Sequence, residues 1–194
     1  RPIQWPKPAL YCKIGAMVAP NMDKNFTRSV LSWYAAGQRD RPWRHTKDAY
    51  RIWISEIMLQ QTRAETVVSY YERFRARYPG GYALADAPEE ELLKAWEGLG
   101  YYSRARSLQK AAKLIVSQHG GELPADLEKL RALPGIGDYT SGAIASIAFG
   151  IPAAAVDGNV ERVVCRYFAL SEEMGSPERR RLIHELTQEL VPPD

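Results

Sequence analysis

Two acidic residues, Glu56 and Asp157, have sequence surroundings that favour opposite charge states. Glu56 lies in an apolar stretch, and no cationic residue stands three or four positions away on a helix. Such a carboxyl loses hydration without gaining a counter-ion, so its pKa should rise, as a general acid requires. Asp157 directly precedes an expected helix, whose dipole stabilises an ionised carboxylate. A surface glutamate and a simple helix-capping aspartate are the alternatives.

A neutral acid paired with a carboxylate anion is the arrangement that cleaves glycosidic bonds. The reaction passes through an oxocarbenium-like transition state, which needs a proton for the leaving group and negative charge near the sugar. If the chain also binds DNA, the leaving group would be a base extruded from the duplex. The residues by themselves make this chain a candidate N-glycosylase.

Glu56 is expected on a helix over residues 50–62. Its buried stripe would consist of Tyr50, Trp53, Ile54 and Ile57. The helix ends in a polar group able to enter a groove or wedge against bases, formed by Gln60, Gln61 and Thr62.

A second helix pair is expected around the stretch from Leu133 to Thr140. Leucines recur at helical spacing before it, and a run of small and apolar residues follows it as far as Gly150. Gly135 and Gly137 allow positive φ angles and present no Cβ to an approaching group. The N–H groups at the start of the following helix favour an anion, such as a phosphodiester. The stretch therefore predicts a phosphate-binding helix-hairpin-helix, with an ordinary glycine-rich corner as the alternative.

The rest of the chain also has helical periodicity, so the predicted fold class is all-α. An N-terminal helix over residues 23–36 would present one apolar stripe, made of Phe26, Val30, Trp33 and Tyr34. Arg39, Arg41 and Arg44 surround Trp43 in a loop that either contacts phosphate and a base or is a solvated turn with a packed tryptophan. Further helices are expected at about 66–78, 88–96, 103–118, 160–168 and 177–190. Ser103 is the expected N-cap of its helix, and Tyr101 and Tyr102 just before it are core residues or a stacking pair.

Composition is consistent with a soluble globular protein that can bind nucleic acid. The 194 residues are 45% hydrophobic and 25% charged, with a net charge of +3. No apolar run reaches the length of a membrane span, and there is no Walker loop, dinucleotide fingerprint or metal-ligand spacing. Two cysteines favour a reducing intracellular location. Residues 1–22 are expected to be an N-terminal extension, either upstream sequence or an addition from cloning.

Five motifs together resemble the helix-hairpin-helix DNA glycosylase superfamily, and more closely the adenine-specific mismatch glycosylase (MutY) family. They lie at residues 42–44, 55–62, 98–104, 133–140 and 156–160. The resemblance implies two helical lobes with a DNA-binding cleft between them. The six-helix lobe would span residues 46–152, and residues 23–45 and 153–194 would form the second lobe.

The resemblance implies a monofunctional adenine glycosylase of base excision repair, which removes adenine opposite 8-oxoguanine or guanine. Glu56 would protonate adenine N7, and Asp157 would stabilise the oxocarbenium ion or a covalent sugar intermediate. Tyr139 stands where bifunctional relatives carry a Schiff-base lysine, so strand cleavage is not expected. The implied DNA-binding residues are Gln60, Gln61, Thr62, Tyr101, Gly135, Gly137, Arg44 and Asn159.

The family also implies a four-iron-four-sulfur cluster, with ligands beyond residue 194 and no cofactor or metal within this chain. Cys12 and Cys165 do not match the cluster ligands. The expected partners are double-stranded DNA and the C-terminal part of the same protein, with no membrane and a monomeric state. The expected location is the bacterial cytoplasm or nucleoid, or a eukaryotic nucleus or mitochondrion. An endonuclease III-like pyrimidine-lesion glycosylase/lyase and a non-catalytic helix-hairpin-helix DNA-binding module are the alternatives.

Overall fold

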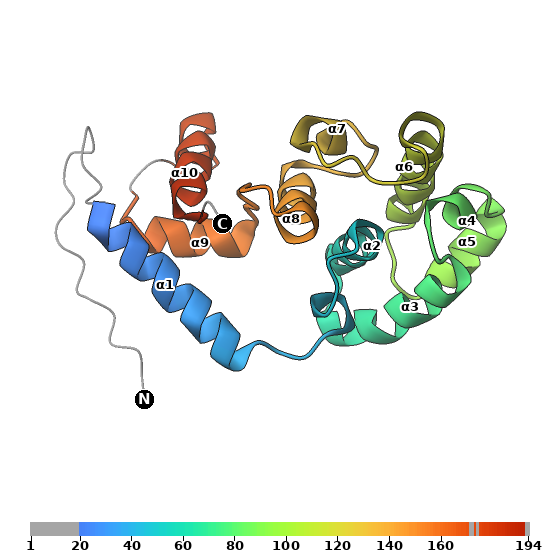
Figure 1. The fold of residues 1–194 in the computed structure, drawn as a ribbon, viewed down its shortest axis with the longest axis horizontal. Coiled ribbons are helices and arrows are strands. Elements are labelled where there is room, and N and C mark those ends of the chain that lie inside the picture. The colour runs from blue at the N-terminus through green and yellow to red at the C-terminus, as the bar shows by residue number, and fades with distance from the viewer. Residues whose placement is uncertain (1–19, 171–172, 174, 193–194) are drawn as a thin grey trace. The chain divides into compact units, whose positions relative to one another are not determined.

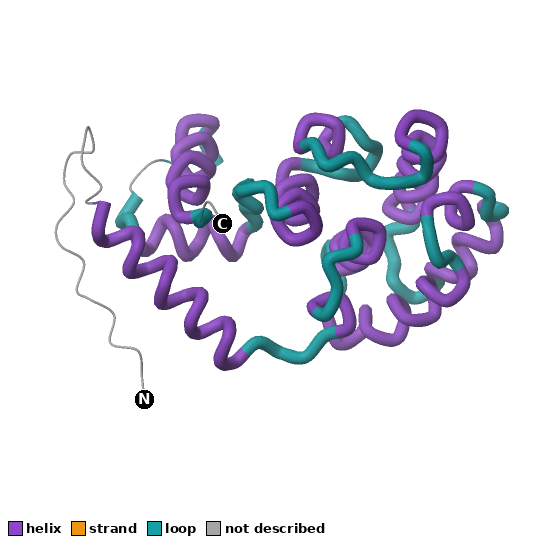
Figure 2. The backbone as a smooth tube through the Cα atoms, in the orientation of Figure 1, coloured by secondary structure: helices purple, strands orange, loops and turns teal. Residues whose placement is uncertain are grey.

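The computed structural model describes residues 20–170, 173 and 175–192. Cys12 and most of the expected extension lie outside these residues. Every regular element in the described ranges is helical, as Figure 2 shows, with ten α-helices and one short 3₁₀ helix. The all-α prediction is confirmed. None of the described helices is both long enough and apolar enough to cross a membrane.

The chain divides into two compact units. The hairpin unit comprises residues 39–155, and the terminal unit comprises the described parts of residues 1–38 and 156–194. Glu56 and Tyr139 belong to the first, and Asp157 belongs to the second.

The hairpin unit contains one 3₁₀ helix and seven α-helices, and the α-helices are labelled in Figure 1. They are η1 (Pro42–Arg44), α2 (Ala49–Leu59), α3 (Ala64–Arg77), α4 (Gly81–Ala85), α5 (Glu89–Trp96), α6 (Ser103–His119), α7 (Leu127–Arg131) and α8 (Asp138–Phe149). Helix α2 packs against α3, α6 and α8, which makes it the central element.

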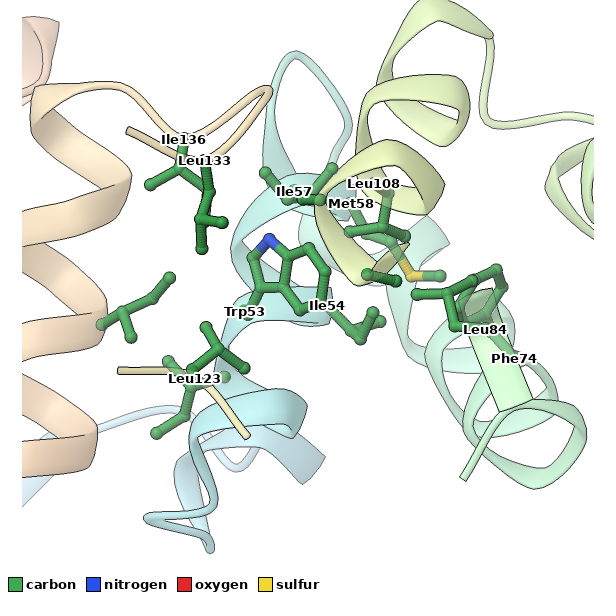
Figure 3. Close-up of a cluster of buried hydrophobic side chains, with 14 of the residues drawn as sticks. Trp53, Ile54, Ile57, Met58, Phe74, Leu84, Leu108, Leu123, Leu133 and Ile136 are labelled. Atoms are coloured by element: carbon green, nitrogen blue, oxygen red, sulfur yellow. The ribbon is translucent and has the colours of Figure 1, made fainter. Parts of the chain in front are cut away.

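The core of this unit forms around α2 because this helix is apolar on nearly all sides. Trp53, Ile54 and Met58 are completely buried. In Figure 3, Trp53 and the neighbouring Ile57 lie between the hairpin residues and α6. A helix that is hydrophobic all round belongs in a protein interior. Glu56 is therefore carried on the most deeply buried helix of the unit.

Local sequence explains where most of these helices begin and end. Asp48 caps α2 by accepting a hydrogen bond from the Arg51 N–H at 2.9 Å. Helices α6 and α8 end at Gly120 and Gly150, both left-handed. The expectation for Ser103 was wrong: Tyr102 precedes α6, and no side chain caps that helix.

The terminal unit contains α1 (Pro20–Gly37), α9 (Gly158–Tyr167) and α10 (Pro177–Leu190). Its small core joins α9 to α10 through Val164, Phe168, Ile183 and Leu186. The Thr27 hydroxyl donates to the Leu190 carbonyl at 3.0 Å and links α1 to α10.

The expected stripe on α1 is only partly packed. Phe26 is half-buried and its ring lies 4.2 Å from that of Tyr167. Val30, Trp33 and Tyr34 are exposed, with 63% of Trp33 accessible. Helical spacing placed these residues on one side of α1, but of the four only Phe26 is half-buried among the described residues.

Candidate active site

The hairpin between α7 and α8 is built around one buried isoleucine and two different glycines. Ile136 is buried, and its N–H donates to the Leu133 carbonyl at 3.1 Å. Gly135 has a φ of +79°, and a Cβ there would lie 2.9 Å from the Cβ of Ser107. Both the backbone angle and the close approach require glycine at this position.

Gly137 corrects one expectation, because its φ is −94° and its ψ is −173°. It is the N-cap of α8 in an extended conformation that other residues also adopt. A Cβ at Gly137 would meet nothing within 4 Å. The neighbouring Asp138 carboxylate is paired with Arg131 at 2.7 Å, which offsets its negative charge at this helix N-terminus. The start of α8 is thus open to an approaching group.

Glu56 is only 8% exposed, so the surface-glutamate alternative is wrong. It sits on α2 one helical turn before Gln60. The Gln60 side chain donates to the Thr140 hydroxyl of α8 at 3.4 Å. Tyr139, the preceding residue of α8, is 36% exposed. The packing of α2 against α8 thus brings the helix of Glu56 alongside the helix of Tyr139.

Asp157 is held by three hydrogen bonds at the start of α9. Its Oδ1 accepts from the Asn159 N–H at 3.0 Å and from the Val160 N–H at 2.8 Å. Its Oδ2 accepts from the Asn159 side-chain amide at 2.9 Å. Asp157 is therefore a helix cap, and the same bonds orient its carboxylate. Asn159 is its immediate partner.

Gln61 and Tyr101 share an unusual backbone conformation. Their φ angles are +57° and +47°, and Ala169 is the other non-glycine residue with a positive φ in the described chain. A left-handed conformation costs a non-glycine residue about 1–2 kcal/mol. Both side chains are exposed, Tyr101 to 61%. Strain of this kind is retained where the surroundings enforce it, and it gathers at functional sites.

Arg104 joins the two turns that carry these residues, and sequence reasoning missed it. One terminal nitrogen, Nη1, donates to the carbonyls of Ile57, Met58 and Gln60, at 2.9 Å and 3.1 Å for the first two. The other, Nη2, donates to the Thr62 hydroxyl at 3.2 Å, the Leu99 carbonyl at 3.0 Å and the Gly100 carbonyl at 3.2 Å. Burial lowers the pKa of the Arg104 guanidinium.

Helical spacing could have identified Arg104. It stands four residues before Leu108 and so lies on the face of α6 that is otherwise buried and apolar. A cation at such a position needs internal acceptors, and here they include the C-terminal carbonyls of α2. A small open cavity beside the guanidinium is lined by Gln60, Ser103, Ser107 and Gly135, among others. The turn residues and the hairpin therefore lie next to each other.

The arginine-rich loop matches the packed-tryptophan alternative. Trp43 is buried, and its ring meets that of Tyr71 edge-on at 5.6 Å. Arg41 pairs with Glu65, and Arg44 donates to the Arg39 carbonyl at 2.8 Å. Arg44 itself is exposed, so its guanidinium is accessible at the surface of the unit.

The described residues do not fit a metal cluster. No group of three or more His, Cys, Asp or Glu side chains within the described ranges is placed to hold a metal ion. The Cys165 sulfur receives a hydrogen bond from Arg179 at 3.2 Å.

Comparison with known sequences assigns the family. The sequence profile described as "HhH-GPD superfamily base excision DNA repair protein" matches residues 54–193. The chain belongs to the HhH-GPD superfamily. The match includes the helices of Glu56, Arg104, the hairpin and Asp157, and it confirms the resemblance drawn from the motifs.

Named HhH-GPD proteins are similar over most of the chain. The human "Adenine DNA glycosylase" is 45% identical over 177 residues, which are 87% of this chain and 32% of that protein. The chain thus spans about a third of that relative's length. The "Thymine/uracil-DNA glycosylase" of Methanothermobacter thermautotrophicus is 36% identical over 87% of this chain and 76% of that protein. A solved thermostable thymine-DNA glycosylase superposes with a TM-score of 0.81 over 89% of this chain and 79% of that one, at 36% identity.

Proposed function

We propose that this protein is a monofunctional adenine DNA glycosylase that removes adenine opposite 8-oxoguanine or guanine in duplex DNA. The observation that carries the proposal is the 45% identity with the human adenine glycosylase across the stretch that holds Glu56, Tyr139 and Asp157. Residues 46–152 would form one DNA-contacting lobe, and residues 23–45 with 153–194 would form the other.

Glu56 is the proposed general acid. Glu56 is buried on an apolar helix, where its carboxyl would be shielded from bulk water and held to donate a proton to a bound base. It would transfer its proton to adenine N7 as the bond between the base and C1′ breaks. The resulting Glu56 carboxylate would then take a proton from the water that attacks C1′, which leaves free adenine, an abasic site and the acid restored.

Asp157 is the proposed electrostatic partner. Its three hydrogen bonds fix a carboxylate anion, which would stabilise positive charge on the sugar in the transition state. Tyr139 supports the monofunctional assignment, since a phenol hydroxyl cannot form the imine required for strand cleavage.

The proposed DNA contacts divide by chemistry. Gly135 and Gly137 would bring the N–H groups of the hairpin to a backbone phosphate. Gln60, Gln61, Thr62 and Tyr101 would contact the displaced and opposite bases, and Arg44 and Asn159 would line the pocket for adenine. Exposure of Gln61, Tyr101 and Gly137 supports these assignments.

Single-turnover base release from duplexes with one defined mismatch tests the proposal. In the full-length protein, we expect adenine release opposite 8-oxoguanine, and Glu56→Gln to slow it by about 10²–10⁴-fold while duplex binding persists. Glu72→Gln, the same substitution on an exposed site of α3, is the matched control and should leave the rate unchanged. Base release by Glu56→Gln at the parent rate would contradict the role of Glu56 as general acid.

The same assay separates the competing functions. Release of thymine or uracil opposite guanine, with adenine untouched, would favour the activity named for the Methanothermobacter relative. Borohydride trapping of a covalent lysine–DNA adduct would favour the glycosylase/lyase reading. Binding without release of any base would favour a non-catalytic DNA-binding module.

A further inference from the structure

Arg104 occupies a position that neither the acid–base chemistry nor the phosphate contact explains. It is 9% exposed, it lies on the buried face of α6, and its charge is met by five carbonyls and one hydroxyl. Its Nε has no hydrogen-bond partner among the described residues, so the two terminal nitrogens make all of these bonds. A buried cation that binds so many carbonyls fixes the position of the backbone segments to which those carbonyls belong.

The acceptors fall into two groups, one for each strained turn. Nη1 binds the last carbonyls of α2 and the carbonyl of Gln60, immediately before Gln61. Nη2 binds the carbonyls of Leu99 and Gly100, immediately before Tyr101, and also reaches back to the Thr62 hydroxyl. A positive charge at the C-terminus of α2 is also favoured by the helix dipole, and α2 has no basic residue of its own in its last turn.

Two aromatic residues complete the arrangement around the guanidinium. Its carbon lies 5.5 Å from the ring centre of Trp96 and 5.6 Å from that of Tyr101. The Trp96 indole N–H donates to the Gly100 carbonyl at 3.1 Å, which is also an acceptor for Arg104. The Tyr101 ring therefore rests on the same cation that holds its backbone.

We propose that Arg104 is a positioning residue, which holds the Gln61 turn and the Tyr101 turn in one fixed arrangement before DNA binds and so sets discrimination between mismatched and paired bases. This inference rests on the proposed function, because it takes Gln61 and Tyr101 as the side chains that contact bases. A preorganised pair of turns avoids the entropic cost of ordering them on the duplex, and this raises affinity for the matching site.

Lysine is the informative replacement. Arg104→Lys keeps the positive charge but has one nitrogen in place of a planar fork, so it cannot serve both turns. Arg106→Lys is the matched control, because Arg106 lies on the same helix, half-exposed, with Glu89 as its partner at 2.8 Å. Both variants should unfold cooperatively, which circular dichroism checks.

Hydrogen exchange of the free full-length protein tests the positioning directly. We expect Arg104→Lys to speed amide exchange about tenfold in peptides covering residues 59–63 and 98–102, and Arg106→Lys to leave both unchanged. If Arg104→Lys does not fold, Trp96→Phe replaces it: this variant removes the indole bond to Gly100 and shrinks the buried ring beside the guanidinium, and it should loosen residues 98–102 more than residues 59–63. Unchanged exchange at both turns would overturn the inference.

Binding then tests the link to discrimination. The probe is a duplex with a cleavage-resistant 2′-fluoro-deoxyadenosine opposite 8-oxoguanine, compared with a fully paired duplex. We expect Arg104→Lys to lower the affinity ratio about tenfold in the parent protein, and to change it little in a Gln61→Ala/Tyr101→Ala background, where no side chains remain to be positioned. An equal loss in both backgrounds would indicate a merely structural role. Failure of the proposed function can be told apart from failure of this inference. In the first case the parent protein would release no adenine, but Arg104→Lys would still speed hydrogen exchange in both turns.

Discussion

The hairpin and the Arg104-held turns lie side by side in the hairpin unit, yet they reach left-handed backbone conformations by different means. In the hairpin the residue with positive φ is a glycine, Gly135. In the two turns the residues are Gln61 and Tyr101, and one buried arginine holds both. Glycine would suffice in the hairpin if, as proposed, only backbone N–H groups contact the DNA there. A clamp is needed where the side chain itself must be presented.

Replacement of Gly135 should have the largest effect on stability. We expect Gly135→Ala to lower the free energy of unfolding by about 2–4 kcal/mol, because it adds a left-handed strain and a close contact with the Cβ of Ser107 at 2.9 Å. Gly150→Ala is the control: its φ is +65° but a Cβ there meets nothing within 4 Å, so the cost should be about 1 kcal/mol. Denaturant unfolding measures both, and equal losses would show that the contact with Ser107 relaxes freely.

Replacement of Gln61 should have an effect of opposite sign. We expect Gln61→Gly to raise the free energy of unfolding by about 0.5–1 kcal/mol by relieving strain, and to weaken binding to a mismatched duplex by removing the side chain. Ala169→Gly relieves a similar φ of +51° in the terminal unit and should gain stability without loss of binding. If Gln61→Gly binds the mismatched duplex as tightly as the parent, then the Gln61 side chain, which Arg104 is proposed to position, does not contribute to binding.

Local and tertiary features also differ in how well they could be predicted from the sequence. Apolar periodicity located α2 and the apolar surroundings of Glu56, the proposed acid, because local spacing determines which face of a helix is buried. The predicted helix ran to residue 62, whereas α2 ends at Leu59. Arg104 of α6, which is 47 residues after Ile57 and 46 after Met58, donates to the carbonyls of both residues near this end. Helical spacing places Arg104 on a buried face of α6, but no pattern local to α2 shows that Arg104 binds there.

The two glycines of the hairpin illustrate the same limit on a smaller scale. Their identical type predicted identical conformations, but only Gly135 is left-handed. The two glycines differ in their surroundings: Gly135, with positive φ, lies against Ser107, and Gly137 is the N-cap of α8. These surroundings are tertiary features that the residue type does not reveal. Similarly, spacing placed Trp33 on an apolar stripe but could not show that Trp33 is left exposed among the described residues.

Gly137 gives the sharpest test, with the smallest expected change in stability. Because its backbone is extended and a Cβ would meet nothing within 4 Å, Gly137→Ala should change the free energy of unfolding by no more than about 0.5–1 kcal/mol. Gly80→Ala is a close match, since Gly80 is also an extended N-cap, that of α4, with nothing within 4 Å. We expect Gly137→Ala alone to weaken duplex binding, about tenfold, because its methyl group would stand between the first N–H groups of α8 and a phosphate. Equal binding by the two variants would mean that the hairpin does not approach the DNA backbone through Gly137.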